Sequence, residues 1–182
     1  MKTMETSILA VLLALSTGCA TGANPSSQEG AKAGTVVRFD QYTKDTTVFG
    51  PPLRCGQYGM DFLRLAAIRE RNEKKWTYCA HFTTHRIRSQ GRASYFSAYD
   101  DKGTKLTMMN TRSGILPITD GLAEETVAVV FSREQLAAAT SLGLKFKLLG
   151  HGDSTELFIQ PDYVKGFLDK LAMAQSADAP VR

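Results

Sequence analysis

The stretch LKFKLLGHGDSTELFIQPDYVKGFLDKL, residues 144–171, carries the clearest secondary-structure pattern in the chain. Apolar residues alternate with lysines over residues 144–148, as in a strand with one buried face. Residues 150–154 (GHGDS) turn the chain, and residues 155–160 return it as a second strand. Pro161 then begins a helix. The helix carries an apolar stripe at helical spacing, formed by Val164, Phe167, Leu168 and Leu171.

Strand patterns also fill most of the sequence that precedes this stretch. Short runs of β-branched and aromatic residues predict strands over residues 35–39, 46–49, 76–87, 92–99, 104–109 and 125–131. Residues 100–103 (DDKG) predict a hairpin turn, because glycine supplies the positive φ that such a turn needs. Ser132 and Gln135 form a capping-box pattern at the start of a short helix that ends before Gly143.

Residues 61–75 (DFLRLAAIRERNEKK) are compatible with two structures. They contain no glycine or proline and are rich in helix formers, which favours a helix. They also lead into the strand-like residues 76–87, and the polar residues 71–75 could form the turn of a hairpin, which we favour. The chain as a whole predicts a β-dominated α+β fold. We expect an antiparallel β sandwich or barrel-like domain with a short internal helix and a C-terminal amphipathic helix.

The N-terminal residues have the pattern of an export signal. Lys2 precedes an unbroken apolar run, Ile8–Leu15, that is too short for a transmembrane helix of about 20 residues. The sequence LSTGC at residues 15–19 resembles the lipobox of bacterial lipoproteins. In that class the cysteine, here Cys19, receives diacylglycerol and becomes the new N-terminus. An ordinary cleaved signal, with an incidental cysteine, is the alternative.

The resemblance implies an address and a division of the chain. Residues 1–18 would be removed as the signal peptide, and Ala20 after the cysteine implies the outer membrane, facing the periplasm or the cell surface. Residues 19–34 are small and polar, so we expect a lipidated cysteine followed by a flexible tether. Residues 35–175 then form one globular domain, and residues 176–182 a frayed tail.

The other two cysteines, Cys55 and Cys79, agree with export. An oxidising periplasm favours a disulfide between them. Such a bridge closes a loop of about 25 residues and contributes roughly 3 kcal/mol in the chain-entropy model. Two buried free thiols are the alternative.

Cys79, His81 and His85 fall on one face of the strand expected over residues 76–87, because side chains alternate along a strand. Residues four apart in a strand lie about 13 Å from each other. That separation is too large for both histidines to bind one metal ion. We therefore expect no metal ion here, and a solvated or hydrogen-bonded face instead.

The sequence from His151 to Ser154 invites comparison with a catalytic motif. Gly152, Asp153 and Ser154 resemble the motif of the GDSL-type hydrolases, but Thr155 stands in place of the leucine and no histidine follows. A catalytic nucleophile needs a base within reach, oriented by a third group, and the sequence offers no such set. We predict a hairpin turn here, no catalytic residue in the chain and no cofactor.

Positive charge is concentrated in residues 54–92, which hold nine basic and three acidic side chains, a local charge of +6 within a chain of +4. Export argues against nucleic acid as the partner. Lipid headgroups, lipopolysaccharide phosphates, cell-wall carboxylates and acidic proteins are the anions outside the cytoplasm. We predict that Arg86, Arg88 and Arg92 form a patch for an anionic partner. A solvated sheet face is the alternative.

Three functions are compatible with these features. The first, which we favour, is a non-enzymatic envelope lipoprotein: an accessory or binding subunit that docks a partner protein or an anionic envelope polymer. The second is an inhibitor of an enzyme, with residues 110–121 (NTRSGILPITDG) as the inhibitory loop. Its anchoring side chains would be Ile115, Leu116 and Pro117. The third is a hydrolase that uses scattered carboxylates, namely Asp100, Asp101, Asp153 and Glu156.

Overall fold

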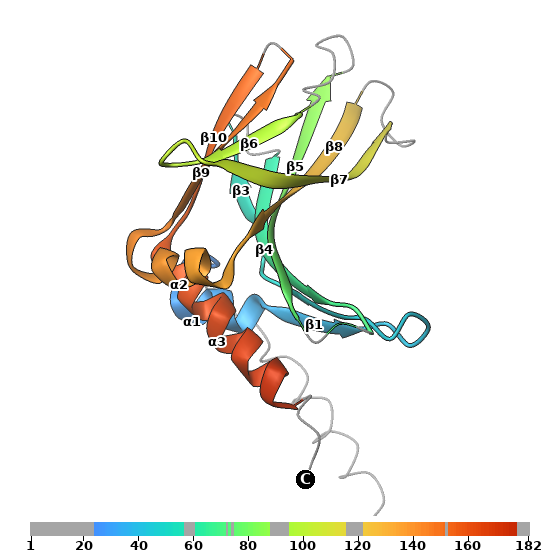
Figure 1. Ribbon diagram of the computed structural model, residues 1–182, viewed down its shortest axis with the longest axis vertical. Helices are drawn as coiled ribbons and strands as arrows, with labels where there is room; N and C mark the ends of the chain where they lie inside the picture. The colour runs from blue at the N-terminus through green and yellow to red at the C-terminus, as the bar shows by residue number, and fades with distance from the viewer. Residues whose placement is uncertain are drawn as a thin grey trace, which may run out of the picture.

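The computed structural model describes residues 24–177, apart from 57–60, 72, 74, 88–94, 116–121 and 152. Ten strands and three helices make up this part of the chain (Figure 1). The helices are α1 (Gln28–Gly34), α2 (Arg133–Leu142) and α3 (Pro161–Ala177). The strands are β1 (Val36–Phe39), β2 (Thr46–Phe49), β3 (Leu53–Cys55), β4 (Asp61–Arg69), β5 (Thr77–Ile87), β6 (Ser97–Asp100), β7 (Lys105–Ile115), β8 (Leu122–Phe131), β9 (Leu144–Gly150) and β10 (Asp153–Ile159). The predicted β-dominated α+β class is confirmed.

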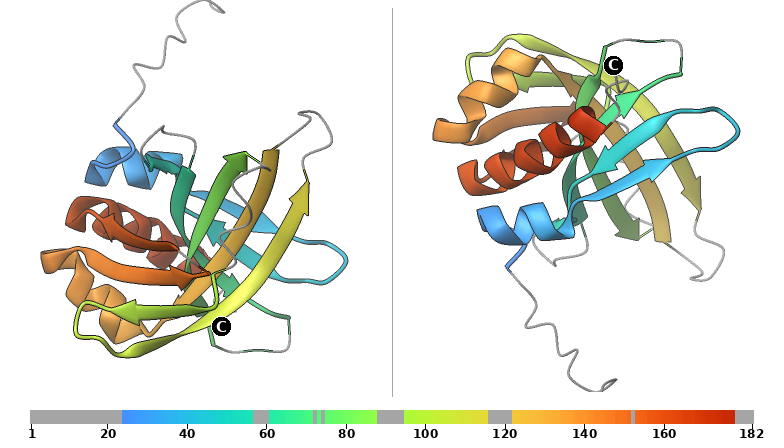
Figure 2. Two further views of the ribbon diagram at one scale, coloured as in Figure 1. Left: turned by 90° about the horizontal axis from the view of Figure 1, so that it is seen from above. Right: turned by 90° about the horizontal axis from the view of Figure 1, so that it is seen from below.

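The strands form a single antiparallel sheet that curls strongly. Their order is β1-β2-β4-β5-β8-β7-β6-β9-β10, with β3 paired to β4. Strand β7 joins the two parts of the curl, because its first residues pair with β6 and residues 107–115 pair with β8. Figures 1 and 2 show the sheet curving around α3, with α1 and α2 on either side of that helix. The expected sandwich- or barrel-like architecture is thus built from one continuous sheet.

The core lies between the inner face of this sheet and the helices. Alternate residues of β4, such as Leu63 and Leu65, are buried in the same cluster as Phe167 of α3. Full burial of one such side chain contributes about 1.5–3 kcal/mol. The apolar stripe predicted for α3 is also confirmed: Val164, Phe167 and Leu171 are buried, and Leu168 packs against them.

Local sequence signals located most of the elements correctly. The hairpin interpretation of residues 61–75 is confirmed, because β4 and β5 pair antiparallel on either side of it. Ser132 and Gln135 form the predicted capping box at the start of α2, each side chain accepting from the backbone N–H of the other. Gly143 ends α2 with a φ of 80°, a conformation that favours glycine.

A Gly-Pro-Pro break at residues 50–52 separates β2 from β3 and interrupts the pairing along β4. The prolines have no N–H to offer a neighbouring strand. Tyr163 of α3 reaches into this break: its hydroxyl donates to the Pro51 carbonyl oxygen (2.7 Å) and accepts from the Leu65 N–H (3.3 Å). Tyr163 is 0% exposed, and burial raises the pKa of its hydroxyl. Gly50 makes this approach possible, because a Cβ at that position would overlap the tyrosine hydroxyl.

The flexible tether expected over residues 19–34 is wrong in its second half. Residues 28–34 form α1, which packs along α3 and buries Ala31 completely. Gly166 of α3 allows this close contact, because a Cβ there would overlap the carbonyl oxygen of Gln28. The small residues that suggested flexibility instead let two helices approach each other.

The predicted disulfide is also wrong, because Cys55 and Cys79 are free. Cys55 pairs with Asp61 of β4, whereas Cys79 pairs with Ala66, five residues further along the same strand. This register separates the cysteines by about 16 Å along the sheet, whereas a disulfide needs Cα atoms within about 7 Å. Burial raises the pKa of Cys55 to about 11 and that of Cys79 to about 12.

The inhibitory loop expected over residues 110–121 is shorter than its sequence suggested. Residues 110–115, including Ile115, belong to β7 and pair with β8. The remaining residues, 116–121, lie outside the described part of the chain. Pairing with β8 continues the strand through polar residues that have no strand pattern of their own. At the other end of the chain, α3 extends by two residues into the tail expected over residues 176–182.

Replacement of Tyr163 by phenylalanine tests the contact between α3 and the break in the sheet. The variant leaves the Leu65 N–H and the Pro51 carbonyl without their partner in a buried site, so we expect a loss of about 1–3 kcal/mol in the free energy of unfolding, measured in urea. Tyr42→Phe is the matched control, because that side chain is 95% exposed and its change should be below about 0.5 kcal/mol. Equal effects of the two substitutions would contradict the role of this hydroxyl.

Candidate functional site

The outer face of the sheet points away from the helices and begins with a small apolar patch. Ala66, Cys79 and Ala128, on β4, β5 and β8, are each fully buried although none of the described helices packs on them. Phe49 and Ile68 pack against these residues. The larger side chains around the patch therefore determine the charge and polarity of this face.

Four of these surrounding residues, Arg38, Phe49, Arg64 and His81, form what we call the arginine–aromatic cluster. The guanidinium carbon of Arg64 lies 4.4 Å from the centre of the Phe49 ring, and that of Arg38 lies 5.8 Å from it. The His81 imidazole meets the same ring edge-on, with centroids 6.1 Å apart and an interplanar angle of 88°. Because β2 lies between β1 and β4, one phenylalanine receives a cation from each neighbouring strand. Exposed contacts of this kind contribute about 0.5–1 kcal/mol each.

Neither arginine of the cluster has an acidic partner among the described residues. No hydrogen bond or ion pair joins Arg38 or Arg64 to another side chain in that part of the chain. Arg64 is half-buried, and burial lowers the pKa of its guanidinium, with the charge of Arg38 acting in the same direction. A guanidinium presents a rigid fork of donors that matches a carboxylate or a phosphate. The arrangement is therefore suited to receiving an anion.

His81 adds a half-buried imidazole to the same cluster. It lies directly opposite Arg64 in the pairing of β4 and β5. Its Nε2 is buried and has no hydrogen-bond partner in the described part of the chain. Burial, together with the charge of Arg64, lowers the pKa of His81 to about 4. The imidazole is therefore neutral near pH 7, so the cluster's positive charge comes from the two arginines.

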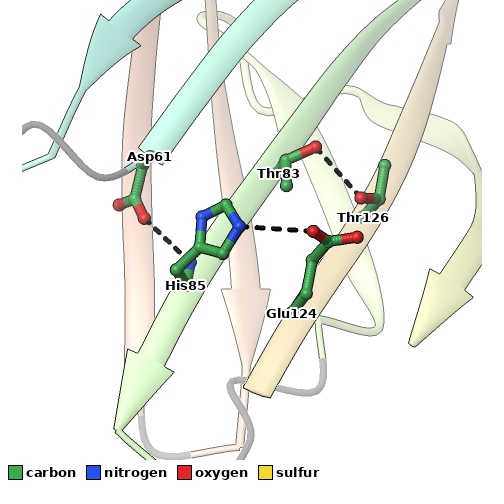
Figure 3. Close-up of polar contacts among 5 residues, drawn as sticks. All are labelled: Asp61, Thr83, His85, Glu124 and Thr126. Carbon is green, nitrogen blue, oxygen red and sulfur yellow. Dashed lines mark hydrogen bonds and ion pairs between the residues drawn. The ribbon is translucent and has the colours of Figure 1, made fainter. Parts of the chain in front are cut away.

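A second group of polar residues continues along the outer face toward the far end of β5 (Figure 3). His85 Nε2 lies 3.2 Å from a carboxylate oxygen of Glu124, directly opposite on β8. Asp61 accepts from the His85 backbone N–H at 3.2 Å. The hydroxyls of Thr83 and Thr126 bond to each other at 3.0 Å. These are cross-strand pairs of the kind that stabilise a sheet. A catalyst here would use His85 Nε2 or the hydroxyls of Thr83 and Thr126, and each of these atoms already takes part in one of the cross-strand pairs.

The residues predicted for the anionic patch do not form the cluster. Arg86 lies in β5, opposite Ala123 of β8, and its side chain is outside the described part of the chain. Arg88, Arg92 and the predicted lipidation site Cys19 are likewise outside it. The patch formed by Arg86, Arg88 and Arg92 therefore remains a prediction.

The sequence did hold a signal for Arg64. Side chains alternate between the two faces along residues 61–65 (DFLRL). Arg64 therefore lies on the other face from its buried neighbours Leu63 and Leu65, which is the outer face. Arg38 joins it only through the pairing of β1 with β2 and of β2 with β4. That pairing brings together residues 26 positions apart, which no local pattern predicts.

Two of the four scattered carboxylates proposed for a hydrolase, Asp100 and Glu156, have structural partners. Asp100 accepts from the backbone N–H groups of Lys102 and Thr104 in the β6–β7 turn. Glu156 lies 3.4 Å from the Lys145 ammonium on the neighbouring strand and 4.0 Å from that of Lys147. Asp101 is exposed in the same turn as Asp100, and the side chain of Asp153 is outside the described part of the chain.

The GHGDS segment forms the turn of the β9–β10 hairpin, as predicted, and its exposed histidine packs against an aromatic ring. His151 lies 5.1 Å from Phe96, measured between ring centroids. Within the described residues, no group of three or more histidine, cysteine, aspartate or glutamate side chains lies close enough together to hold a metal ion.

Comparisons of the chain with protein-family models, with curated proteins and with solved structures find no match. Among the helices described here, none combines the length and the apolar character needed to cross a membrane.

The half-buried imidazole of His81, with its lowered pKa, predicts a specific dependence of stability on pH. Between about pH 6.5 and about pH 4 the unfolded chain binds a proton at this histidine and the folded chain does not, so the free energy of unfolding falls as the pH falls through this window. The shift corresponds to a loss on the order of 3 kcal/mol. Urea unfolding at about pH 7.5 and about pH 4.5 measures it.

His81→Gln should remove this part of the pH dependence, whereas the exposed His151→Gln should leave it unchanged. If the two variants and the parent chain lost the same stability between the two pH values, His81 would not be the buried titrating group.

Proposed function

We propose that the chain is a non-enzymatic envelope lipoprotein, anchored through Cys19, that docks the acidic surface of a partner protein on the arginine–aromatic cluster. One observation carries the proposal: Arg38 and Arg64 approach a single ring without an acidic partner among the described residues. Two like charges held together, one of them half-buried, reduce the stability of the free domain. A carboxylate from a partner supplies the missing counter-charge and two donor–acceptor contacts per guanidinium.

The position of the cluster supports its presentation to a partner. The described chain enters the domain through α1, which belongs to the layer of helices (Figure 2). The arginine–aromatic cluster lies on the opposite face of the sheet. A chain tethered ahead of α1 would therefore hold this face away from its point of attachment.

The surroundings of the cluster favour a protein over an anionic polymer. Val36 of β1, two residues from Arg38 and therefore on the same face of the sheet, is 50% exposed. Tyr42, in the loop that follows, is almost fully exposed. Aromatic residues and arginine are enriched in protein interfaces, and contiguous exposed apolar side chains mark such surfaces. A phosphate- or carboxylate-rich polymer needs the cations but not this apolar border.

The experiment places a photo-crosslinking amino acid at Val36 of the full chain in cells and compares the parent with Arg38→Gln/Arg64→Gln. We expect one major protein adduct, reduced at least tenfold in the double variant, because both counter-charges for the partner's carboxylates are gone. Lys145→Gln/Lys147→Gln is the matched control, since these lysines already face Glu156 on β9 and β10, and its adduct should be unchanged.

A Cys19→Ser chain run in parallel tests the anchoring half of the proposal, and we expect it to leave the membrane fraction. An adduct of equal yield in all variants would show that the cluster is not the docking surface. An adduct with a polymer, lost in the arginine variant, would overturn the choice of a protein partner. A Cys19→Ser chain that remained with the membranes would contradict lipid anchoring at that residue.

A further inference from the structure

Strand β1 forms one end of the sheet, and its side chains are exposed on both faces. Every residue from Val36 to Phe39 is exposed, including Val37 at 43%. The strand pairs with β2 on one side, and no described strand pairs with it on the other. An apolar edge of this kind is a template for pairing with another chain.

The backbone of β1 shows which groups face the open side. The Asp40 N–H donates to the Asp45 carbonyl at 2.9 Å, which makes that position a hydrogen-bonded pair of the hairpin. Hydrogen-bonded and non-hydrogen-bonded pairs alternate in an antiparallel ladder. The N–H and C=O groups of Arg38 therefore point to β2, and those of Val37 and Phe39 point outward. The open edge offers two donors and two acceptors at the spacing of a β-strand.

The strand at the other end of the sheet, β10, is built differently. Leu157 and Ile159 bury one of its faces, while Glu156 on the other face pairs with lysines of β9. Buried faces and charged side chains are common ways of protecting an edge. Only one of the two end strands, β1, therefore exposes apolar side chains on both faces.

We infer that β1 accepts an extended segment of the partner as an additional antiparallel strand, and that this segment carries a carboxylate opposite Arg38. The inference rests on the proposed function and names the form of the partner at that surface. Backbone hydrogen bonds to Val37 and Phe39 would supply affinity, and the charge opposite Arg38 would set the register. The partner's segment would extend the outer face on which the arginine–aromatic cluster lies.

Charge favours a partner segment over a second copy of this chain. Two copies of β1 that pair through the outward groups of Val37, with like faces aligned, place Val37 opposite either Val37 or Phe39 of the other copy. Pairing Phe39 with Phe39 would instead set Val37 against Gln41, which lies in the turn that follows β1. With Val37 opposite Phe39 the two Arg38 residues are directly opposite, and with Val37 opposite Val37 they are diagonal neighbours about 7–8 Å apart. Both registers bring like charges together on one face, whereas a glutamate or aspartate opposite Arg38 removes the conflict.

The test uses the full chain and a blocked ten-residue peptide that alternates valine with glutamate and threonine. Fluorescence polarisation gives the affinity, and amide hydrogen exchange reports on the Val37 and Phe39 N–H groups. We expect binding with slower exchange at these two amides, and about fivefold weaker binding of a matched peptide with lysine in place of glutamate. Arg38→Glu should reverse the preference between the two peptides.

Two substitutions at one position separate the backbone from the side chain. Val37→Pro removes an outward N–H and should abolish binding, whereas Val37→Thr keeps the N–H and should bind within about twofold of the parent. Urea unfolding verifies that both variants are folded; should Val37→Pro unfold, peptides N-methylated at the paired positions replace it and should not bind.

Binding that survives loss of the N–H would overturn the inference. So would slow exchange of the Val37 and Phe39 amides in the free chain together with formation of a dimer. If these peptides failed while the Val36 adduct still depended on Arg38 and Arg64, docking would stand and strand addition would be wrong.

Discussion

The contact of the Tyr163 hydroxyl with the break at residues 50–52 is the constraint on which the rest of the structure depends. Two prolines interrupt the pairing beside β4 and leave the Leu65 N–H facing a gap that a helix residue fills. A buried N–H without a partner costs about 1–3 kcal/mol, so α3 is held at one place on the inner face. Gly166 then allows α1 to pack on α3, and both helices cover the side of the sheet that holds the main core. None of the three described helices lies on the opposite face.

The parts of this fold that local patterns control could be predicted from the sequence. Alternation in residues 144–148, the capping box at Ser132 and the apolar stripe of α3 each depend on residues within one or two turns or strands. The Tyr163 hydroxyl contacts residues 98 and 112 positions away, so no pattern within either segment indicates these contacts. The same limit explains the errors. Residues 28–34 look like a tether because their burial comes from distant parts of the chain, chiefly α3. Cys55 and Cys79 look like a disulfide pair because the number and spacing of cysteines do not show the register of the strands that carry them.

Prediction of the candidate site was limited in the same way. The excess of positive charge between residues 54 and 92 was visible, and it includes Arg64. The sequence favoured the three arginines nearest one another, Arg86, Arg88 and Arg92, because neighbours in sequence are the only neighbours that a sequence displays. The sheet instead brings Arg38 next to Arg64 through β2, with Phe49 between them. The cluster also places a neutral imidazole, not a third cation, at its buried side.

The two faces of the sheet thus affect the stability of the domain in opposite ways. The inner face gains stability from buried apolar area and a satisfied polar contact. Within the described residues, the outer face holds two guanidinium groups without an acidic partner and a strand edge without a neighbour, at some cost to the free domain. The central claim is that a partner protein covers β1 and the adjoining outer face when the protein is in the envelope membrane. Amide hydrogen exchange of the full chain in envelope membranes, compared with the purified chain in detergent, measures this directly. The account predicts slower exchange in residues 36–39 and no change in α2 or β10; unchanged exchange in residues 36–39, or protection confined to the helices, would contradict it.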